Sequence, residues 1–129
     1  MSLQAPPRVQ RFQAGREAPA LVSAYAHCEG VTRRSGSSFA AAFWMLPRPR
    51  RRALHAIYAF CRLADDIADD PSVCGDRTRL LECWRGELVA AYRGRATTPV
   101  GVALGDAARR FALPESIFQD LLLLSLIHI

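Results

Sequence analysis

The pattern of apolar and polar positions along the chain predicts helices from Pro19 onward. Apolar side chains recur there every three or four residues, which is the spacing of one face of an α-helix. No segment alternates apolar and polar residues with a period of two, and none carries a hairpin turn. We therefore expect an all-α fold.

Breaks in this pattern divide the chain into separate helical segments. Pro19 suits a first helical turn, and the polar run at 33–38 ends that helix. Ser38 is a candidate cap for a short helix that Pro47 ends. The segments expected to be helical are 19–32, 39–46, 49–70, 77–92, 99–111 and 114–124. Residues 1–18 are polar and contain prolines, so we expect a flexible N-terminus.

One polar stripe runs along the helix expected over 49–70. At 100° per residue it contains four side chains, which are Tyr58, Arg62, Asp65 and Asp69. Asp65 and Asp69 lie one turn apart, about 6 Å between Cβ atoms, and repel each other when unpaired. A magnesium ion would remove that repulsion, since Mg²⁺ takes one or two carboxylates and fills its octahedron with water and phosphate oxygens. Arg62 is placed to contact the same phosphate.

A second polar stripe on this helix is expected to face water. It contains Arg52, His55, Asp66 and Asp70, and for His55 a packing position stays open beside a surface position. The remaining arc is wide and apolar, which indicates a helix mostly enclosed by protein and places the Asp65/Asp69 stripe beside a cavity. Spacing alone also permits a solvated helix end in which Arg62 and Asp66 form an i,i+4 ion pair, and that alternative stays open.

Composition and charge narrow the function classes only slightly. The chain has 129 residues, a net charge of +5 and 17 basic residues, all of them arginine. Arginine favours bidentate contacts with phosphate, but a GC-rich genome produces the same bias. The run at 48–52 permits a nucleic-acid patch. Because no reading motif or interleaved aromatic residue accompanies it, we expect a solvated helical turn and no nucleic-acid partner.

The pattern of cysteines and histidines, together with the apolar runs, suggests a cytoplasmic protein without a zinc site. The four cysteines form no C-x-x-C pair, and no histidine lies at ligand spacing from them, so we expect reduced thiols. The N-terminus lacks the apolar core of a secretory signal, and the longest apolar runs are too short to span a bilayer. We expect a soluble protein, with peripheral membrane contact left open. Trp44 and Trp84 are expected in the core, with Trp44 beside a lipid cavity as the alternative.

The stretch SGSSFAAAFWMLPRPRRRALHAIYAFCRLADDIADD, residues 35–70, resembles the N-terminal signature of the squalene/phytoene synthase family. The order of its parts carries the resemblance: Ser-Ser-Phe, Leu-Pro, an arginine run, Tyr-x-x-x-Arg and Asp-Asp-x-x-Asp. The similarity extends from about Tyr25 to about Leu122. It implies an all-α bundle around a central cavity and an enzyme that joins two prenyl diphosphates head to head.

The resemblance also implies roles for the residues of the first stripe. Asp65 and Asp69 resemble the first aspartate motif, which binds magnesium and, through it, the substrate diphosphate. Arg62 resembles the family's diphosphate-contacting arginine. Tyr58 resembles the aromatic residue at the mouth of the central cavity. All four are therefore expected in the catalytic site.

A second group of residues is implied at the substrate site, with one departure from the family. Ser38 and Phe39 resemble the pair that contacts diphosphate and lines the cavity. Ala40 stands where many members carry a second aromatic residue, so the shape of the cavity there is open.

The C-terminal part of the chain departs further from the family pattern. The family carries a second aspartate motif on a later helix, and this sequence has none. After Leu122 the chain reads LLSLIHI instead of an acidic, glycine-containing turn. We expect residues 19–122 to be the N-terminal portion of a synthase domain and 123–129 to be a foreign tail, with a divergent C-terminus as the alternative.

The implied function is a squalene-type condensation. Two farnesyl diphosphates would join through a cyclopropyl intermediate to give presqualene diphosphate or a squalene-type product, with Mg²⁺ as cofactor and NADPH left open. The alternatives are a phytoene synthase that uses geranylgeranyl diphosphate, a non-catalytic relative in respiratory-complex assembly, and a basic nucleic-acid-binding protein. Without a second aspartate motif, we expect the chain by itself to be inactive, poorly soluble and weakly ordered.

Overall fold

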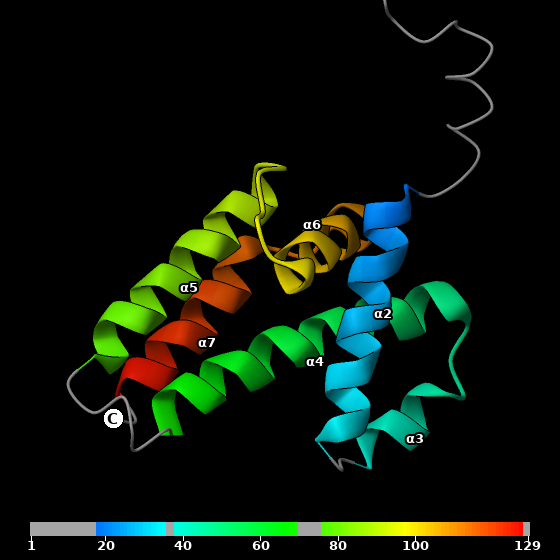
Figure 1. Cartoon of the computed structure of the whole chain (residues 1–129), viewed down its shortest axis with the longest axis horizontal. Helices are drawn as coiled ribbons and strands as arrows, with labels where there is room; N and C mark the ends of the chain where they lie inside the picture. The colour runs from blue at the N-terminus through cyan, green and yellow to red at the C-terminus, as the bar shows by residue number, and fades with distance from the viewer. Residues whose placement is uncertain (1–17, 36–37, 70–75, 128–129) are drawn as a thin grey trace, which may run out of the picture.

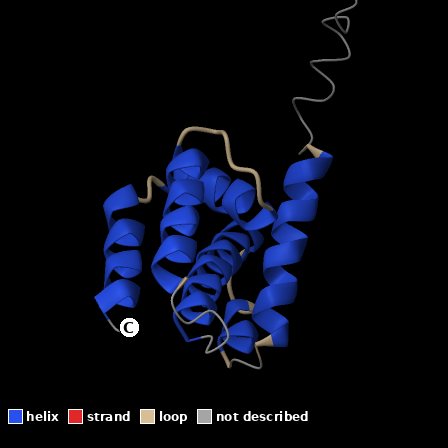
Figure 2. Cartoon of the chain, turned by 60° about the vertical axis from the view of Figure 1, so that its left-hand side comes forward, coloured by secondary structure: helices blue, strands red, loops and turns tan. Residues whose placement is uncertain are grey.

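The computed structural model of the protein describes residues 18–35, 38–69 and 76–127, and this part of the chain is helical (Figures 1 and 2). Its helices are α2 (Pro19–Arg34), α3 (Phe39–Phe43), α4 (Arg48–Asp69), α5 (Arg77–Tyr92), α6 (Pro99–Phe111) and α7 (Glu115–Ile127). No strand occurs in these described ranges. The all-α prediction is confirmed. No helix within them is long and apolar enough to cross a membrane.

The helix boundaries follow the sequence pattern closely, with two differences. The short helix ends at Phe43, three residues before the expected end, and the side chain of Ser38 forms no capping hydrogen bond. The expected cap is therefore wrong. The last helix continues past Leu124 to Ile127. The suspected foreign tail thus begins inside α7, and its foreign origin stays a prediction. The N-terminus that we expect to be flexible lies outside the described residues up to position 17.

The long helix α4 lies at the centre of the packing. It contacts α2 and α6 on one side and α5 and α7 on another, and α5 and α7 run side by side (Figure 1). Phe60 of α4 stacks on Trp84 of α5, with 5.2 Å between ring centroids, and meets Phe118 of α7 edge-on. Trp84 Nε1 also donates to the backbone oxygen of Phe60 at 3.3 Å. The expected core position of Trp84 is confirmed.

A buried polar junction ties α2 and α6 to the start of α4. The Tyr25 hydroxyl donates to Asp106 Oδ2 at 2.6 Å, and Arg110 Nε donates to the same oxygen at 2.7 Å. The guanidinium carbon of Arg52 lies 4.0 Å from the Tyr25 ring centroid. Burial, reinforced by the carboxylate, raises the pKa of Tyr25, so its hydroxyl remains a donor throughout the physiological range.

The crossing of α5 and α6 requires a glycine. A Cβ atom at Gly105 would lie 2.5 Å from the backbone oxygen of Ala91, so the two backbones are in direct contact there. Glu87 of α5 holds the following loop in place, because its carboxylate accepts hydrogen bonds from Thr97 and Thr98. Thr98 in turn caps α6 by accepting from Gly101 N at 3.0 Å.

His55 is a packing residue, although the other described members of its polar stripe are exposed or half-buried. His55 is 5% exposed, because α2 crosses this side of α4. The Thr32 hydroxyl donates to the backbone oxygen of Cys28, which leaves Thr32 Oγ1 to accept from His55 Nδ1 at 3.1 Å. Asp66 is exposed as expected, and Asp70 lies outside the described residues.

Stability is expected to fall as the pH drops below about 6.5, the ordinary pKa of histidine. Burial is the main cause that lowers the pKa of His55 in the folded chain; Arg51 and Arg33 lower it further, and Glu29 opposes them. The unfolded chain therefore binds a proton in a pH range where the folded chain does not, and this favours unfolding. Urea unfolding at pH 7.5 and at pH 5.5 measures the effect.

A matched pair of variants isolates the histidine responsible. His55→Gln is expected to reduce the difference in unfolding free energy between the two pH values, because Gln does not titrate. His27→Gln removes an exposed histidine of α2 and is expected to leave that difference unchanged. An unaltered pH dependence in His55→Gln would contradict the assignment.

Trp44 is exposed rather than buried. Its side chain is 61% exposed, and that of Met45, the next residue, is 88% exposed. Both lie in the link between α3 and α4. The prediction that Trp44 belongs to the core is therefore wrong, because within the described part of the chain no helix covers this link.

Candidate active site

The predicted stripe lies on the C-terminal half of α4. Asp65 and Asp69 are both exposed, one helical turn apart, and Tyr58 is half-buried on the same face. Cys61 lies one turn before Asp65. Burial and the negative charge of Asp65 raise the pKa of the Cys61 thiol to about 11, so it stays protonated and is a poor metal ligand.

Arg62 forms an ion pair within α4. Its Nη2 atom lies 3.1 Å from Asp66 Oδ1, and both side chains are about half exposed, at 48% and 53%. The i,i+4 pair that spacing permitted is therefore present. Such exposed pairs contribute only about 0.3–0.5 kcal/mol, so the pair does not prevent the guanidinium from turning to a phosphate on the adjacent face.

The two carboxylates suit a magnesium ion that is shared with a substrate. Within the described ranges, no three side chains of His, Cys, Asp or Glu converge to form a complete protein cage. Asp65 and Asp69 supply two oxygen ligands, and Mg²⁺ commonly completes its octahedron with water and substrate phosphates. The oxygens of these two residues therefore fit a magnesium ion whose other ligands come from outside the described side chains.

An apolar groove lies along the N-terminal half of α4. It has a volume of about 310 Å³ and is lined by Leu46, Arg50, Ala53, Leu54, Ile57, Phe111 and Leu113. Leu54 is one turn before Tyr58, and Ile57 is one turn before Cys61, so the groove borders the stripe that carries the carboxylates. From Leu54 to Asp65 the helix rises about 16 Å. An apolar groove and a pair of carboxylates thus lie on adjoining faces of α4.

The expectation that protein mostly encloses the apolar arc of α4 holds only in part. Ala56, Phe60, Ala64 and Ala68 are buried. Several larger side chains of the arc are only half-buried within the described structure, namely Leu54, Ile57, Cys61, Leu63 and Ile67. The structure therefore shows an open face beside the carboxylates, where the sequence pattern predicted an enclosed cavity.

Ser38 and Phe39 lie on a different element from the other predicted site residues. Ser38 is exposed directly before α3, and the side chain of Phe39 lies outside the described structure. The helix α3 packs against α2 and α4, and the Phe43 ring meets His55 edge-on at 5.4 Å between centroids. The substrate-contact role of Ser38 and Phe39 stays a prediction.

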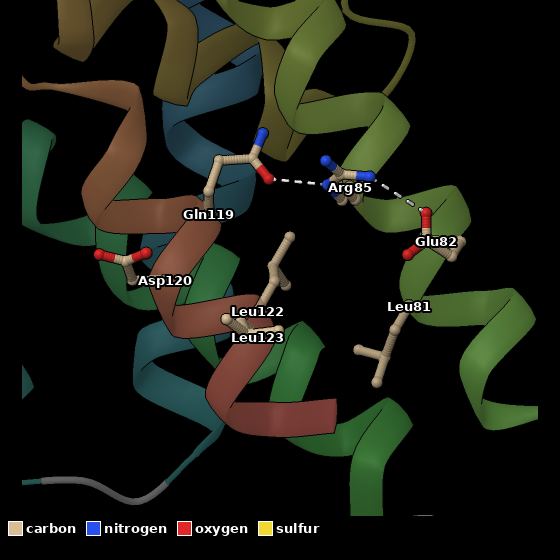
Figure 3. Close-up of a pocket in the computed structure, with 7 residues that line it drawn as sticks. All are labelled: Leu81, Glu82, Arg85, Gln119, Asp120, Leu122 and Leu123. Carbon is tan, nitrogen blue, oxygen red and sulfur yellow. Dashed lines mark hydrogen bonds and ion pairs between the residues drawn. The ribbon is translucent and has the colours of Figure 1, made fainter. Parts of the chain in front are cut away.

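A second hollow, between α5 and α7, was not predicted from the sequence (Figure 3). It measures about 350 Å³ and is lined by Leu81, Glu82, Arg85, Gln119, Asp120, Leu122 and Leu123. Arg85 Nε donates to Gln119 Oε1 at 2.8 Å, and Arg85 Nη1 lies 3.4 Å from Glu82 Oε2. These contacts join the two helices, so the polar groups of this hollow act as a bridge in the fold.

Comparisons with known proteins identify the family of the chain. The family model described as squalene/phytoene synthase matches residues 32–123. The chain is 40% identical over 87 residues to presqualene diphosphate synthase from Rhodopseudomonas palustris, which covers 67% of this chain and 31% of the relative. It is 37% identical over 99 residues to phytoene synthase from Mycobacterium tuberculosis, which covers 77% and 32%.

A solved structure extends the agreement to the fold. The crystal structure of squalene synthase HpnC from Alicyclobacillus acidocaldarius matches 84% of this chain and 40% of its own, with a TM-score of 0.74 and 32% identity. The chain spans about a third of the length of the curated relatives it matches. The family model nevertheless covers most of this chain and includes the α4 carboxylates. The protein belongs to the squalene/phytoene synthase family.

Proposed function

We propose that this chain supplies the first magnesium–diphosphate site of an enzyme that joins two farnesyl diphosphates head to head. The observation that carries the proposal is the position of the apolar groove on α4, beside the stripe that carries Asp65 and Asp69. The groove suits a prenyl chain, and the carboxylates suit the metal-bound diphosphate at its end. The presqualene diphosphate synthase relative supports the choice of product class.

Each residue of the site has a distinct task in the proposed reaction. Asp65 and Asp69 hold magnesium, which would neutralise the leaving diphosphate. Arg62 turns from Asp66 and binds diphosphate oxygens with its two parallel N–H groups. The apolar groove, with Tyr58 at its carboxylate end, keeps water from the allylic carbocation that forms when the C–O bond breaks. The double bond of the second substrate then attacks this cation, and loss of a proton closes the cyclopropane ring.

The proposed site needs further carboxylates. A diphosphate that leaves as an anion requires several positive charges around it at once, and carboxylates would hold the metal ions that supply them. Asp65 and Asp69 supply only two negative charges for this purpose. We propose that a second set of carboxylates faces α4 in the working enzyme. We expect the 129-residue chain by itself to release no diphosphate from farnesyl diphosphate with magnesium.

The choice of substrate is tested with an enzyme that carries residues 19–122 together with the remaining length of a family member. We expect it to prefer farnesyl over geranylgeranyl diphosphate and to give a presqualene-type product. A phytoene-type product from geranylgeranyl diphosphate would support the alternative that the phytoene synthase relatives represent. Retained Asp65, Asp69 and Arg62 favour an enzyme over a non-catalytic assembly factor.

Arg62→Lys is expected to weaken substrate binding about tenfold, which corresponds to the loss of one charge-assisted hydrogen bond. Lysine keeps the charge but cannot make the bidentate contact. KM for farnesyl diphosphate, measured in the same longer enzyme, reports the effect. Asp66→Asn is the matched control, because it removes the ion-pair partner of Arg62 and leaves the guanidinium in place. Unchanged KM in Arg62→Lys would show that Arg62 is only a partner of Asp66.

A further inference from the structure

The start of α4 and the link before it form an exposed surface that combines apolar and cationic side chains. We call it the tryptophan–arginine surface, and it consists of the exposed Trp44, Met45, Arg48 and Arg50 together with the half-buried Arg51. The guanidinium carbon of Arg51 lies 4.7 Å from the centroid of the Trp44 ring, which places the two kinds of side chain together. The surface lies outside the Asp65/Asp69 site, and Arg50 is the member of it that also lines the apolar groove.

The positive charge of this surface is not neutralised locally. Within the described residues, Arg48, Arg50 and Arg51 form no ion pair with a carboxylate. Arg48 and Arg51 line a hollow of about 130 Å³ whose only acidic lining residue is Glu29. Glu29 is already paired with Arg33 on α2. The surface therefore presents three net positive charges beside an exposed indole and an exposed thioether.

We propose that the tryptophan–arginine surface docks the protein on anionic membranes. Indole rings favour the level of the lipid headgroups, and apolar side chains such as Met45 gain by entering the acyl boundary. Each arginine close to an anionic bilayer raises the affinity for that bilayer about fivefold. A nucleic acid would also attract the arginines, but it offers no apolar layer for Met45 or for exposed Val22, which lines the same hollow.

The position of the surface adds a second reason. Arg50 and the neighbouring Leu46 also line the apolar groove of α4, so the surface lies at one end of that groove. A bilayer bound to this surface would bring its acyl region to the end of the groove. Long apolar chains partition into that region of a bilayer. This consequence for substrate entry rests on the proposed function, whereas binding to the membrane does not.

Co-flotation with vesicles in a density gradient tests the docking directly, needs no substrate, and separates bound chain from any aggregate, which sinks. The 129-residue chain is mixed with vesicles of phosphatidylcholine alone, and with vesicles that also contain phosphatidylglycerol. We expect binding to the anionic vesicles, weaker binding at high salt, and little binding to phosphatidylcholine. Arg48→Gln combined with Arg50→Gln should lower the partition coefficient about twenty-five-fold, at about fivefold for each charge. The charge-matched control combines Arg79→Gln with Arg93→Gln, both exposed on or directly after α5.

Fluorescence locates the bound surface. The chain has two tryptophans, and Trp84 is buried against Phe60, so lipids brominated in the acyl chain should quench Trp44. Trp44→Phe should abolish most of the quenching. Leu124→Ser, which removes an exposed side chain of α7, should leave the quenching intact. Far-UV circular dichroism verifies that every variant keeps its helix content.

The proposal is overturned by any of three outcomes. They are absence of binding to anionic vesicles, equal weakening by the α5 control variant, and vesicle binding without quenching of Trp44. Salt-dependent retention on DNA together with absent vesicle binding would assign the surface to nucleic acid instead. Because vesicle binding is measured without substrate, its failure leaves the prenyl transfer proposal untouched.

Discussion

Asp65→Asn is expected to lower turnover at least about a hundredfold in an enzyme that carries this chain together with the remaining length of a family member. The physical reason is the loss of a charged ligand to the metal that neutralises the leaving diphosphate. Asp69→Asn should have an effect of the same size, because the two carboxylates share one face of α4. Turnover of farnesyl diphosphate, measured over a range of magnesium concentrations, reports both.

The control for this prediction lies on another helix. Asp120→Asn removes an exposed carboxylate of α7 and should leave turnover unchanged. Helix content by circular dichroism should be the same in all three variants, since Asp65 and Asp69 are exposed and contribute little to the core. Turnover close to that of the parent in either α4 variant would contradict the assignment of the metal site.

Gly105→Ala is expected to lower the free energy of unfolding by about 1–3 kcal/mol. The added Cβ atom would lie 2.5 Å from the backbone oxygen of Ala91, and a backbone atom cannot move aside as a flexible side chain can. The helices α5 and α6 would have to separate, and the neighbouring contacts between Glu87 and Thr98 would be strained with them. Urea unfolding followed by circular dichroism measures the loss.

Gly86→Ala provides a control of opposite sign. Gly86 is exposed on α5, and a Cβ atom there meets nothing within 4 Å. Alanine is the better helix former, so this variant should gain about 0.5–1 kcal/mol. Equal effects of the two substitutions would show that helix propensity alone governs both positions and that the α5–α6 crossing tolerates a side chain.

The sequence by itself determined the helices and the order of the chemical groups along them. Periodicity and prolines placed α2, α4, α5 and α6 to within about one or two residues, because helix length and apolar spacing are local properties. The same geometry put Tyr58, Arg62, Asp65 and Asp69 on one stripe. The order of short motifs around them indicated the family, and the family model confirms it.

Only the tertiary structure decided which helix faces are covered. His55 belongs to a polar stripe by angle, yet α2 crosses over it and leaves it 5% exposed. Trp44 is the reverse case, an apolar residue expected in the core that is 61% exposed. The stripe predicted beside a cavity borders an open face, next to a groove that is completed by Phe111 at the end of α6 and by Leu113 of the α6–α7 link. Periodicity shows which residues share a helix face. Whether that face is buried depends on segments distant in sequence, because their positions are set by the packing of the whole bundle.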